Sequence, residues 1–258
     1  MSKMCVRFVA VGLAAGALSG LANAGTGRIV VANDEWTLSD TGFSTSGTPN
    51  TQNFVSSVAT WFTGSATGNS FLAYSNNFGF NQSSLSAAMA GNTWTVSTAV
   101  TFTAANLLAN YDAVFVGGFV ANNQVLIDYV NGGGNVYLAG GTAAFSGPNG
   151  AAQNEANAWN TFLNAFDMEF EGSYNGISGN VTVTGTGHPI FNGVTRLYQN
   201  NGSSIINVTG PNAKVLVASG SDGLYAVWDM GPVIPLPTTA GMAGAGMLVL
   251  GAARRRRR

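Results

Sequence analysis

Cysteine and histidine are almost absent from this 258-residue chain, which contains one of each. Cys5 lies in an N-terminal apolar segment that is typical of a removed signal, so the mature chain is expected to contain no thiol. This excludes disulfides, thiolate metal sites and a cysteine nucleophile. A single histidine also cannot supply the several ligands of a zinc centre. We predict no metal and no cofactor.

Several catalytic and nucleotide-binding motifs are missing as well. No G-x-S-x-G supports a serine hydrolase, and neither G-x-G-x-x-G nor G-x-x-x-x-G-K-S/T supports nucleotide binding. His188 stands in Gly187-His188-Pro189, where it is a general base, a metal ligand or a turn residue. We favour the turn residue and predict no catalytic residue.

Basic residues are scarce in the central part of the chain. Between Gly25 and Pro237 only Arg28, Arg196 and Lys214 are basic, against eleven acidic residues, which gives a net charge of −8. A nucleic-acid-binding protein normally presents a basic surface. The composition therefore argues against DNA or RNA as a partner.

The N-terminus predicts export. Lys3 and Arg7 precede the apolar run 8–21, and Ala22-Asn23-Ala24 fits the small-x-small pattern cut by signal peptidase. Cleavage is expected after Ala24, with Ala22 and Ala24 as the recognised residues. Residues 1–24 are then a signal peptide and residues 25–231 the exported domain.

The C-terminus, residues 232–258, has three ordered parts. A proline motif (Val233, Ile234, Pro235, Leu236, Pro237) precedes 16 uncharged residues, 238–253, which are followed by Arg254, Arg255, Arg256, Arg257 and Arg258. As a helix the uncharged part would measure about 24 Å, slightly short of a hydrocarbon core of roughly 30 Å. The arginines are expected to act as a stop-transfer signal on the cytoplasmic side of the inner membrane.

This arrangement resembles the PEP-CTERM class of sorting signals in its VPLPA-CTERM variant, with one residue inserted between Val233 and Pro235. The resemblance implies a Gram-negative bacterium and an exosortase-like membrane transpeptidase that cuts near the motif. It further implies a secreted or cell-surface protein associated with extracellular polysaccharide. The alternative is a plain C-terminal membrane anchor.

Continuous apolar strands alternate with amphipathic helices through most of the exported domain. Strands are expected at 28–32, 71–74, 94–96, 111–118 and 135–139, and helices at 54–62, 83–90, 122–131 and 154–166, with a loop at 75–79. Such alternation predicts an α/β fold with a mostly parallel central sheet. From residue 167 onward the pattern is of strands alone, so an antiparallel C-terminal extension of the same sheet is expected.

The order of several segments resembles the class I glutamine amidotransferase-like or ThuA-like flavodoxin-type domains. The segments are YDAVFVGG (111–118), DYVNGGGNVYLAGG (128–141), WNTFLNAF (159–166), GHPIFNGV (187–194) and GLYAVWD (223–229). Catalytic members of that group carry a nucleophilic cysteine in the turn after the strand that matches 136–139. Here the turn reads Gly140-Gly141-Thr142, so the resemblance implies a non-catalytic domain, with a hydrolase or amidotransferase-like enzyme as the alternative.

Polar and glycine residues follow the expected parallel strands. Ligands of open α/β sheets bind at the carboxyl ends of the strands. The candidate ligand-binding residues there are Asn76, Asn77, Gly118, Gly141 and Thr142. Amide and hydroxyl groups suit a neutral polar ligand such as a sugar.

Two groups of carboxylates offer oxygen ligands. Asp34 and Glu35 follow the first strand, and Asp167, Glu169 and Glu171 alternate along an expected strand. Either group is a Ca²⁺ ligand set or a solvated surface, and the sequence leaves this choice open.

Overall fold

The computed structural model describes residues 27–118 and 122–231. The expected signal peptide with Ala22 and Ala24, the proline motif and the arginine cluster lie outside these residues. No helix of the described part is both long and apolar enough to span a membrane.

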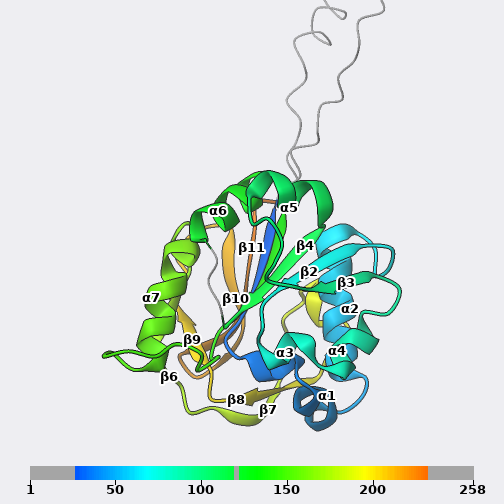
Figure 1. Cartoon of the computed structure of the whole chain (residues 1–258). Coiled ribbons are helices and arrows are strands. Elements are labelled where there is room, and N and C mark those ends of the chain that lie inside the picture. Colours follow the sequence, from blue (N-terminus) through cyan, green and yellow to red (C-terminus); the bar gives the residue numbers. More distant parts are fainter. Residues whose placement is uncertain (1–26, 119–121, 232–258) are drawn as a thin grey trace, which may run out of the picture.

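A twisted sheet runs through the centre of the molecule, with helices on both sides (Figure 1). The strand order is β3-β2-β4-β5-β1-β11-β9-β6, and β10 pairs with β11. Strands β1 (Arg28–Ala32), β2 (Ser70–Tyr74), β3 (Thr93–Val96), β4 (Ala113–Gly117) and β5 (Asn135–Ala139) are parallel to one another. The mostly parallel α/β sheet predicted from the sequence is thus confirmed.

The antiparallel part begins at the centre of the sheet. Strand β11 (Asp222–Asp229) pairs along the whole of β1, with Arg28 opposite Asp229. Beyond β11 the sheet continues with β9 (Ser203–Ile206) and β6 (Glu169–Tyr174), while β10 (Ala213–Ser219) pairs along nearly the whole of β11. The antiparallel extension is confirmed for these four strands.

One part of the C-terminal half leaves the main sheet. Strands β7 (Ser178–Thr182) and β8 (Arg196–Asn200) form a separate two-stranded sheet. The single-sheet prediction was wrong for this hairpin, because β8 packs against α1 (Asp40–Ser46) and the short helix η1 (Glu35–Leu38) instead of the main sheet.

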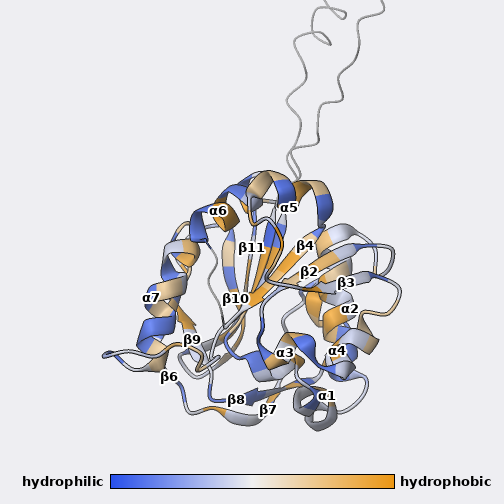
Figure 2. Cartoon of the chain, viewed as in Figure 1, coloured by the Kyte–Doolittle hydropathy of each residue, from blue (hydrophilic) through white to orange (hydrophobic). Residues whose placement is uncertain are grey.

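Two aromatic-rich cores fill the faces of the sheet. On one face α2 (Asn50–Thr63), α3 (Phe78–Asn81), α4 (Ser83–Ala88) and η2 (Pro189–Phe191) cover the strands. The other face carries α5 (Ala104–Asn110), α6 (Asn123–Asn131) and α7 (Ala151–Asn164). Hydrophobic residues accordingly concentrate in the central strands and the inner helix faces (Figure 2).

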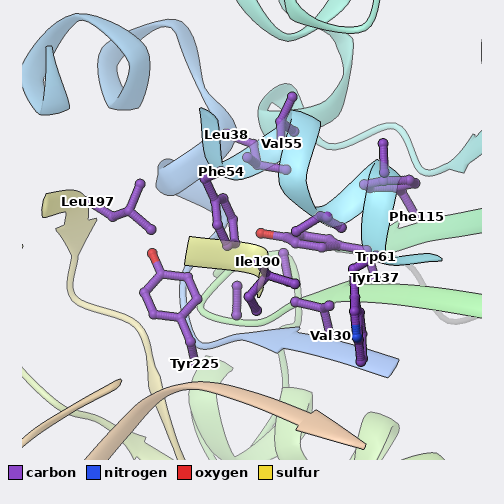
Figure 3. Packing of buried hydrophobic residues seen from close by; sticks show 14 of the residues in the cluster. Val30, Leu38, Phe54, Val55, Trp61, Phe115, Tyr137, Ile190, Leu197 and Tyr225 are labelled. Carbon is purple, nitrogen blue, oxygen red and sulfur yellow. The ribbon is translucent and has the colours of Figure 1, made fainter. Parts of the chain in front are cut away.

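Phe54 anchors the first core. Its ring stacks on Phe191 at 5.4 Å between centroids. It also meets Tyr225 edge-on at 5.5 Å, and the rings of Phe54 and Tyr225 are both labelled in Figure 3. The helix predicted at 54–62 buries its apolar face in this core, which contains Phe54, Val55, Val58, Trp61 and Phe62. Packing of this kind fixes α2 and the chain segments that flank it.

Candidate functional site

The carboxyl ends of the parallel strands bring together four connecting segments. Residues 33–35 follow β1, residues 75–77 follow β2, Gly118 follows β4 and residues 140–142 follow β5. These segments come from distant parts of the chain and meet because parallel strands end at one edge of the sheet. Four of the five predicted ligand-binding residues, Asn77, Gly118, Gly141 and Thr142, lie here beside polar side chains. Asn76 is exposed to solvent.

Asn77 connects the segment after β2 with the segment after β1. Its side-chain amide donates a hydrogen bond to Oε2 of Glu35, while its Oδ1 accepts one of 2.8 Å from the amide of Gly79 at the start of α3. The loop predicted at 75–79 was therefore wrong at its end, where Phe78 and Gly79 begin a helix that Asn77 caps. The cap fixes the orientation of the Asn77 side chain toward Glu35.

Glu155 holds the turn after β5 from the helix α7. Oγ1 of Thr142 donates to Oε1 of Glu155 at 2.6 Å, and the Thr142 amide lies 3.2 Å from both carboxylate oxygens. Glu155 is completely buried and Thr142 is 7% exposed. The sequence reading did not single out Glu155.

Asp34 is the third buried carboxyl. Its Oδ1 accepts a hydrogen bond of 2.9 Å from the amide of Trp36 and its Oδ2 accepts one from the amide of Asn200. The first bond starts η1 and the second joins this turn to β8. We call Asp34, Glu35, Asn77, Thr142 and Glu155 the carboxyl-edge cluster.

Burial sets the protonation of the three carboxyls. It raises the pKa of Asp34 to about 6, of Glu35 to about 8 and of Glu155 to about 7. The hydrogen bonds that each carboxyl accepts lower its pKa, but by less than burial raises it. The charge of Asp34 raises the pKa of both glutamates further. Near neutral pH the cluster therefore combines held protons with negative charge, and the one ion pair of the described residues, Arg28 with Asp229, lies elsewhere.

Two glycines let the backbone segments approach each other closely. Gly141 has φ of +67°, and a Cβ there would lie 2.7 Å from Cα of Gly202. At Gly202 a Cβ would lie 2.2 Å from the carbonyl oxygen of Asn33 and 2.5 Å from its Nδ2. Neither position leaves room for a side chain, so the turn after β5, the β8–β9 turn and the end of β1 are in direct contact.

Polar groups at this contact have no partner. Asn33 and Ser203 are both completely buried, and in the described part of the chain neither polar atom of the Asn33 side chain nor Oγ of Ser203 makes a hydrogen bond. Buried polar atoms are usually satisfied by protein, water or ligand. The amide of Asn33 is directed at Gly202, which itself touches Gly141, the neighbour of Thr142.

Aromatic side chains border the cluster where it approaches the surface. Trp36 and Phe78 directly follow Glu35 and Asn77 in the chain, and their half-exposed rings meet edge-on at 4.8 Å. Tyr174 of β6 is half-exposed as well. Burial raises its pKa, and the charges of Glu155 and Glu35 raise it further. The arrangement combines hydrogen-bonding groups with flat apolar surfaces.

His188 lies at the opposite, amino edge of the sheet. Its ring caps η2 through a 3.4 Å contact from the Ile190 amide to Nδ1 and meets Trp61 edge-on at 5.0 Å. Burial lowers its pKa. The turn role predicted for His188 is confirmed, and it cannot act on Thr142 at the other edge.

A hollow of about 360 Å³ also lies at the amino edge, lined by Arg28, Ser57, Thr60, Trp61, Pro189 and Asn192. The Arg28 guanidinium is already engaged there by Asp229 at 3.4 Å and by the ring and the carbonyl oxygen of Trp61. We therefore place the candidate site at the carboxyl-edge cluster.

The second acidic group does not form a site. Asp167 stands before β6 with φ of +57°, so it does not alternate with Glu169 and Glu171 along one strand as predicted. Glu169 instead accepts hydrogen bonds from Asn160 and Asn207. Among the residues that the structure describes, no group of three or more histidine, cysteine, aspartate or glutamate side chains is arranged to hold a metal ion.

Comparison of this chain with family models, curated proteins and solved structures finds no match.

Proposed function

We propose that the chain is an exported surface protein whose α/β domain binds an extracellular polysaccharide at the carboxyl-edge cluster. The observation that carries this proposal is the convergence of Glu35, Asn77 and Thr142 beside the half-exposed Trp36 and Phe78. Carboxyl, amide and hydroxyl groups exchange hydrogen bonds with sugar hydroxyls, and aromatic rings pack on the apolar face of a pyranose. Export and sorting are supported by the terminal sequences.

The position of the chain ends agrees with display on a surface. Arg28 and Asp229 are paired neighbours, so both ends of the domain leave from the amino edge of the sheet. The carboxyl-edge cluster lies beyond the other end of β1, about 16 Å away for five residues of strand. A tether that follows residue 231 would leave the cluster facing outward.

Binding is tested with the protein purified from its native cells and the polysaccharide of the same cells. Trp36→Leu and Phe78→Leu should each weaken binding, because either change removes a flat ring from the border of the cluster. Tyr111→Leu is the matched control, since Tyr111 is also half-exposed but precedes β4 at the amino edge. Equal binding by all three variants and the native protein would contradict the proposed site.

Sorting is tested by intact mass spectrometry of protein recovered from outside the cells. A species that starts near Gly25 and ends near Pro237 supports an exosortase-like step. A species that retains Arg254 to Arg258 contradicts that step and indicates a membrane-anchored domain.

The pairing of Thr142 with Glu155 favours a second candidate, a hydrolase or amidotransferase-like enzyme. A carboxylate with a pKa of about 7, hydrogen-bonded to a hydroxyl at 2.6 Å, has the geometry and the proton affinity of a general base beside a nucleophile. Against this, the left-handed residue of the turn is Gly141, which has no side chain to react. Ester or glycoside hydrolysis that Thr142→Val abolishes would establish the enzyme.

A further inference from the structure

The negative charge of the carboxyl-edge cluster has no counterpart nearby. The three basic side chains of the described residues belong to other parts of the fold: Arg28 pairs with Asp229 at the amino edge, and Arg196 donates to the carbonyl oxygen of Ser46 at 2.8 Å. Lys214 stands in β10 opposite Val227. A buried carboxylate without a partner is costly, and an opposite charge within about 4 to 6 Å favours its ionised form.

The unpaired polar groups of Asn33 and Ser203 provide a second, independent observation. They are uncharged, completely buried and placed where β1, the turn after β5 and the β8–β9 turn meet. The site therefore offers both an uncompensated acidic group and free neutral donors and acceptors. A metal ion could also take the oxygens of Asn33 and Ser203, but no three carboxyls or histidines of the described residues are grouped to hold one.

We propose that the group recognised by the cluster is a primary ammonium flanked by hydroxyls, as in the glucosamine units of a deacetylated polysaccharide. The inference rests on the proposed function and narrows its ligand. The ammonium would approach Glu35, the carboxyl of the three with measurable exposure, at 5%, with Asp34 and Glu155 behind it. Neighbouring hydroxyls would bond to Asn77 and Thr142, and the sugar ring would pack on Trp36 and Phe78.

The same charges discriminate against other polysaccharides. An N-acetylated sugar carries no cation and leaves the carboxyls unbalanced. A uronic acid adds a carboxylate to a site that already holds three and to a domain with a net charge of −8. The order of affinity is therefore expected to be glucosamine, then N-acetylglucosamine, then galacturonate.

Binding of an ammonium should also depend on pH. The groups that face the cluster are Asp34 and Glu35 after β1, Glu155 of α7 and Tyr174 of β6, with Tyr137 of β5 and Tyr225 of β11 near Asp34. Asp34 loses its proton near pH 6, Glu155 near pH 7 and Glu35 near pH 8, where the tyrosines stay neutral. Affinity for the ammonium should rise as the carboxyls ionise and fall again at the pH where the sugar amine loses its own proton, whereas affinity for a neutral sugar has no reason to follow either change.

The test is calorimetric titration of the protein from its native cells with four probes: glucosamine hexamer, N-acetylglucosamine hexamer, galacturonate hexamer and spermidine. We expect the glucosamine hexamer to bind at least about tenfold more tightly than the acetylated one at pH 7, because the bound ammonium favours the ionised form of Glu35. Glu35→Gln, which keeps an acceptor for Asn77, should remove this preference, and Asp128→Asn on the exposed face of α6 should leave it unchanged. Glu155→Gln serves as the second variant if Glu35→Gln does not fold.

Equal binding of the two glucosamine-based hexamers would overturn the ammonium inference and leave polysaccharide binding intact. Binding of the acetylated hexamer alone would do the same. Spermidine binding as tightly as the glucosamine hexamer would overturn the sugar as the source of the ammonium. Binding of none of the four probes would overturn the inference, and the native polysaccharide assay then decides the proposed function separately.

Discussion

Replacing Glu155 with glutamine should stabilise the protein at alkaline pH. The substitution keeps the shape of the side chain and an oxygen that can accept the bonds from Thr142, but it removes the ionisable group. Glu155 is completely buried, and burial is the main cause of its raised pKa. The native protein must therefore ionise a buried acid as the pH rises, and the variant need not.

The size of the effect follows from the pKa. A rise from 4.5 in the unfolded chain to about 7 in the folded protein corresponds, at about 1.4 kcal/mol per pKa unit, to about 3 kcal/mol at most. Because the folded state holds the proton more tightly, this stability is present below pH 4.5 and is lost as the pH rises through about 7. Glu155→Gln should therefore gain up to about 3 kcal/mol over the native protein at pH 8 and less than about 1 kcal/mol at pH 5.

Urea unfolding followed by tryptophan fluorescence at pH 5 and pH 8 measures this difference. Trp159 lies one helical turn after Glu155 and is completely buried, so its emission should report the transition. Asp128→Asn, an exposed change on α6, is the control and should shift neither value. A Glu155→Gln variant that is no more stable than the native protein at pH 8 would refute the assignment of Glu155 as a buried acid that ionises at a cost.

Three further outcomes are expected. Gly202→Ala should destabilise the protein by about 1 to 3 kcal/mol, because a Cβ would lie 2.2 Å from the carbonyl oxygen of Asn33. Thermal unfolding measures this loss, and an unchanged midpoint would contradict the close approach of Gly202 to Asn33. Phe54→Ala should cost about 3 to 5 kcal/mol in urea unfolding, since the ring is completely buried against Phe191 and Tyr225, and a loss below about 1 kcal/mol would count against this packing. His188→Ala should lower the free energy of unfolding by about 1 kcal/mol, because it removes the contact with Trp61. The variant should still bind polysaccharide as the native protein does, because His188 lies at the other edge of the sheet. A binding defect would show that the candidate site is misplaced.

The parallel half of the fold could be predicted because glycines and apolar runs delimit its elements. Residues 135–139 are a continuous apolar-rich run between glycines 132–134 and 140–141, and β5 occupies the same residues. On α2 the apolar positions repeat with the period of a helix and are all buried. The hairpin β7–β8 could not be placed, because its partner is a helical segment near residue 40 and nothing local indicates so distant a contact.

The candidate site could be predicted only in part. Residues that directly follow parallel strands all lie at one edge of the sheet. This rule correctly predicted that Asn77, Gly118, Gly141 and Thr142 lie close together. The burial of Glu155 could have been predicted, because Glu155 stands four residues before Trp159 and so lies on the apolar face of α7, where a carboxyl is unexpected. The burial of Asn33 could not have been predicted, because it depends on Gly202, which is 169 residues away in the chain.

The pairing of β1 with β11 has a mechanical consequence. If the chain is held beyond residue 231 and the ligand pulls at the segment after β1, the force enters at opposite ends of these two antiparallel strands. The paired residues from Arg28–Asp229 to Ala32–Tyr225 are then loaded together in shear, instead of one after another as when a hairpin is peeled from its end. A central ladder loaded in this way resists extension, which suits the proposed role of a domain that joins a cell to a surrounding polymer.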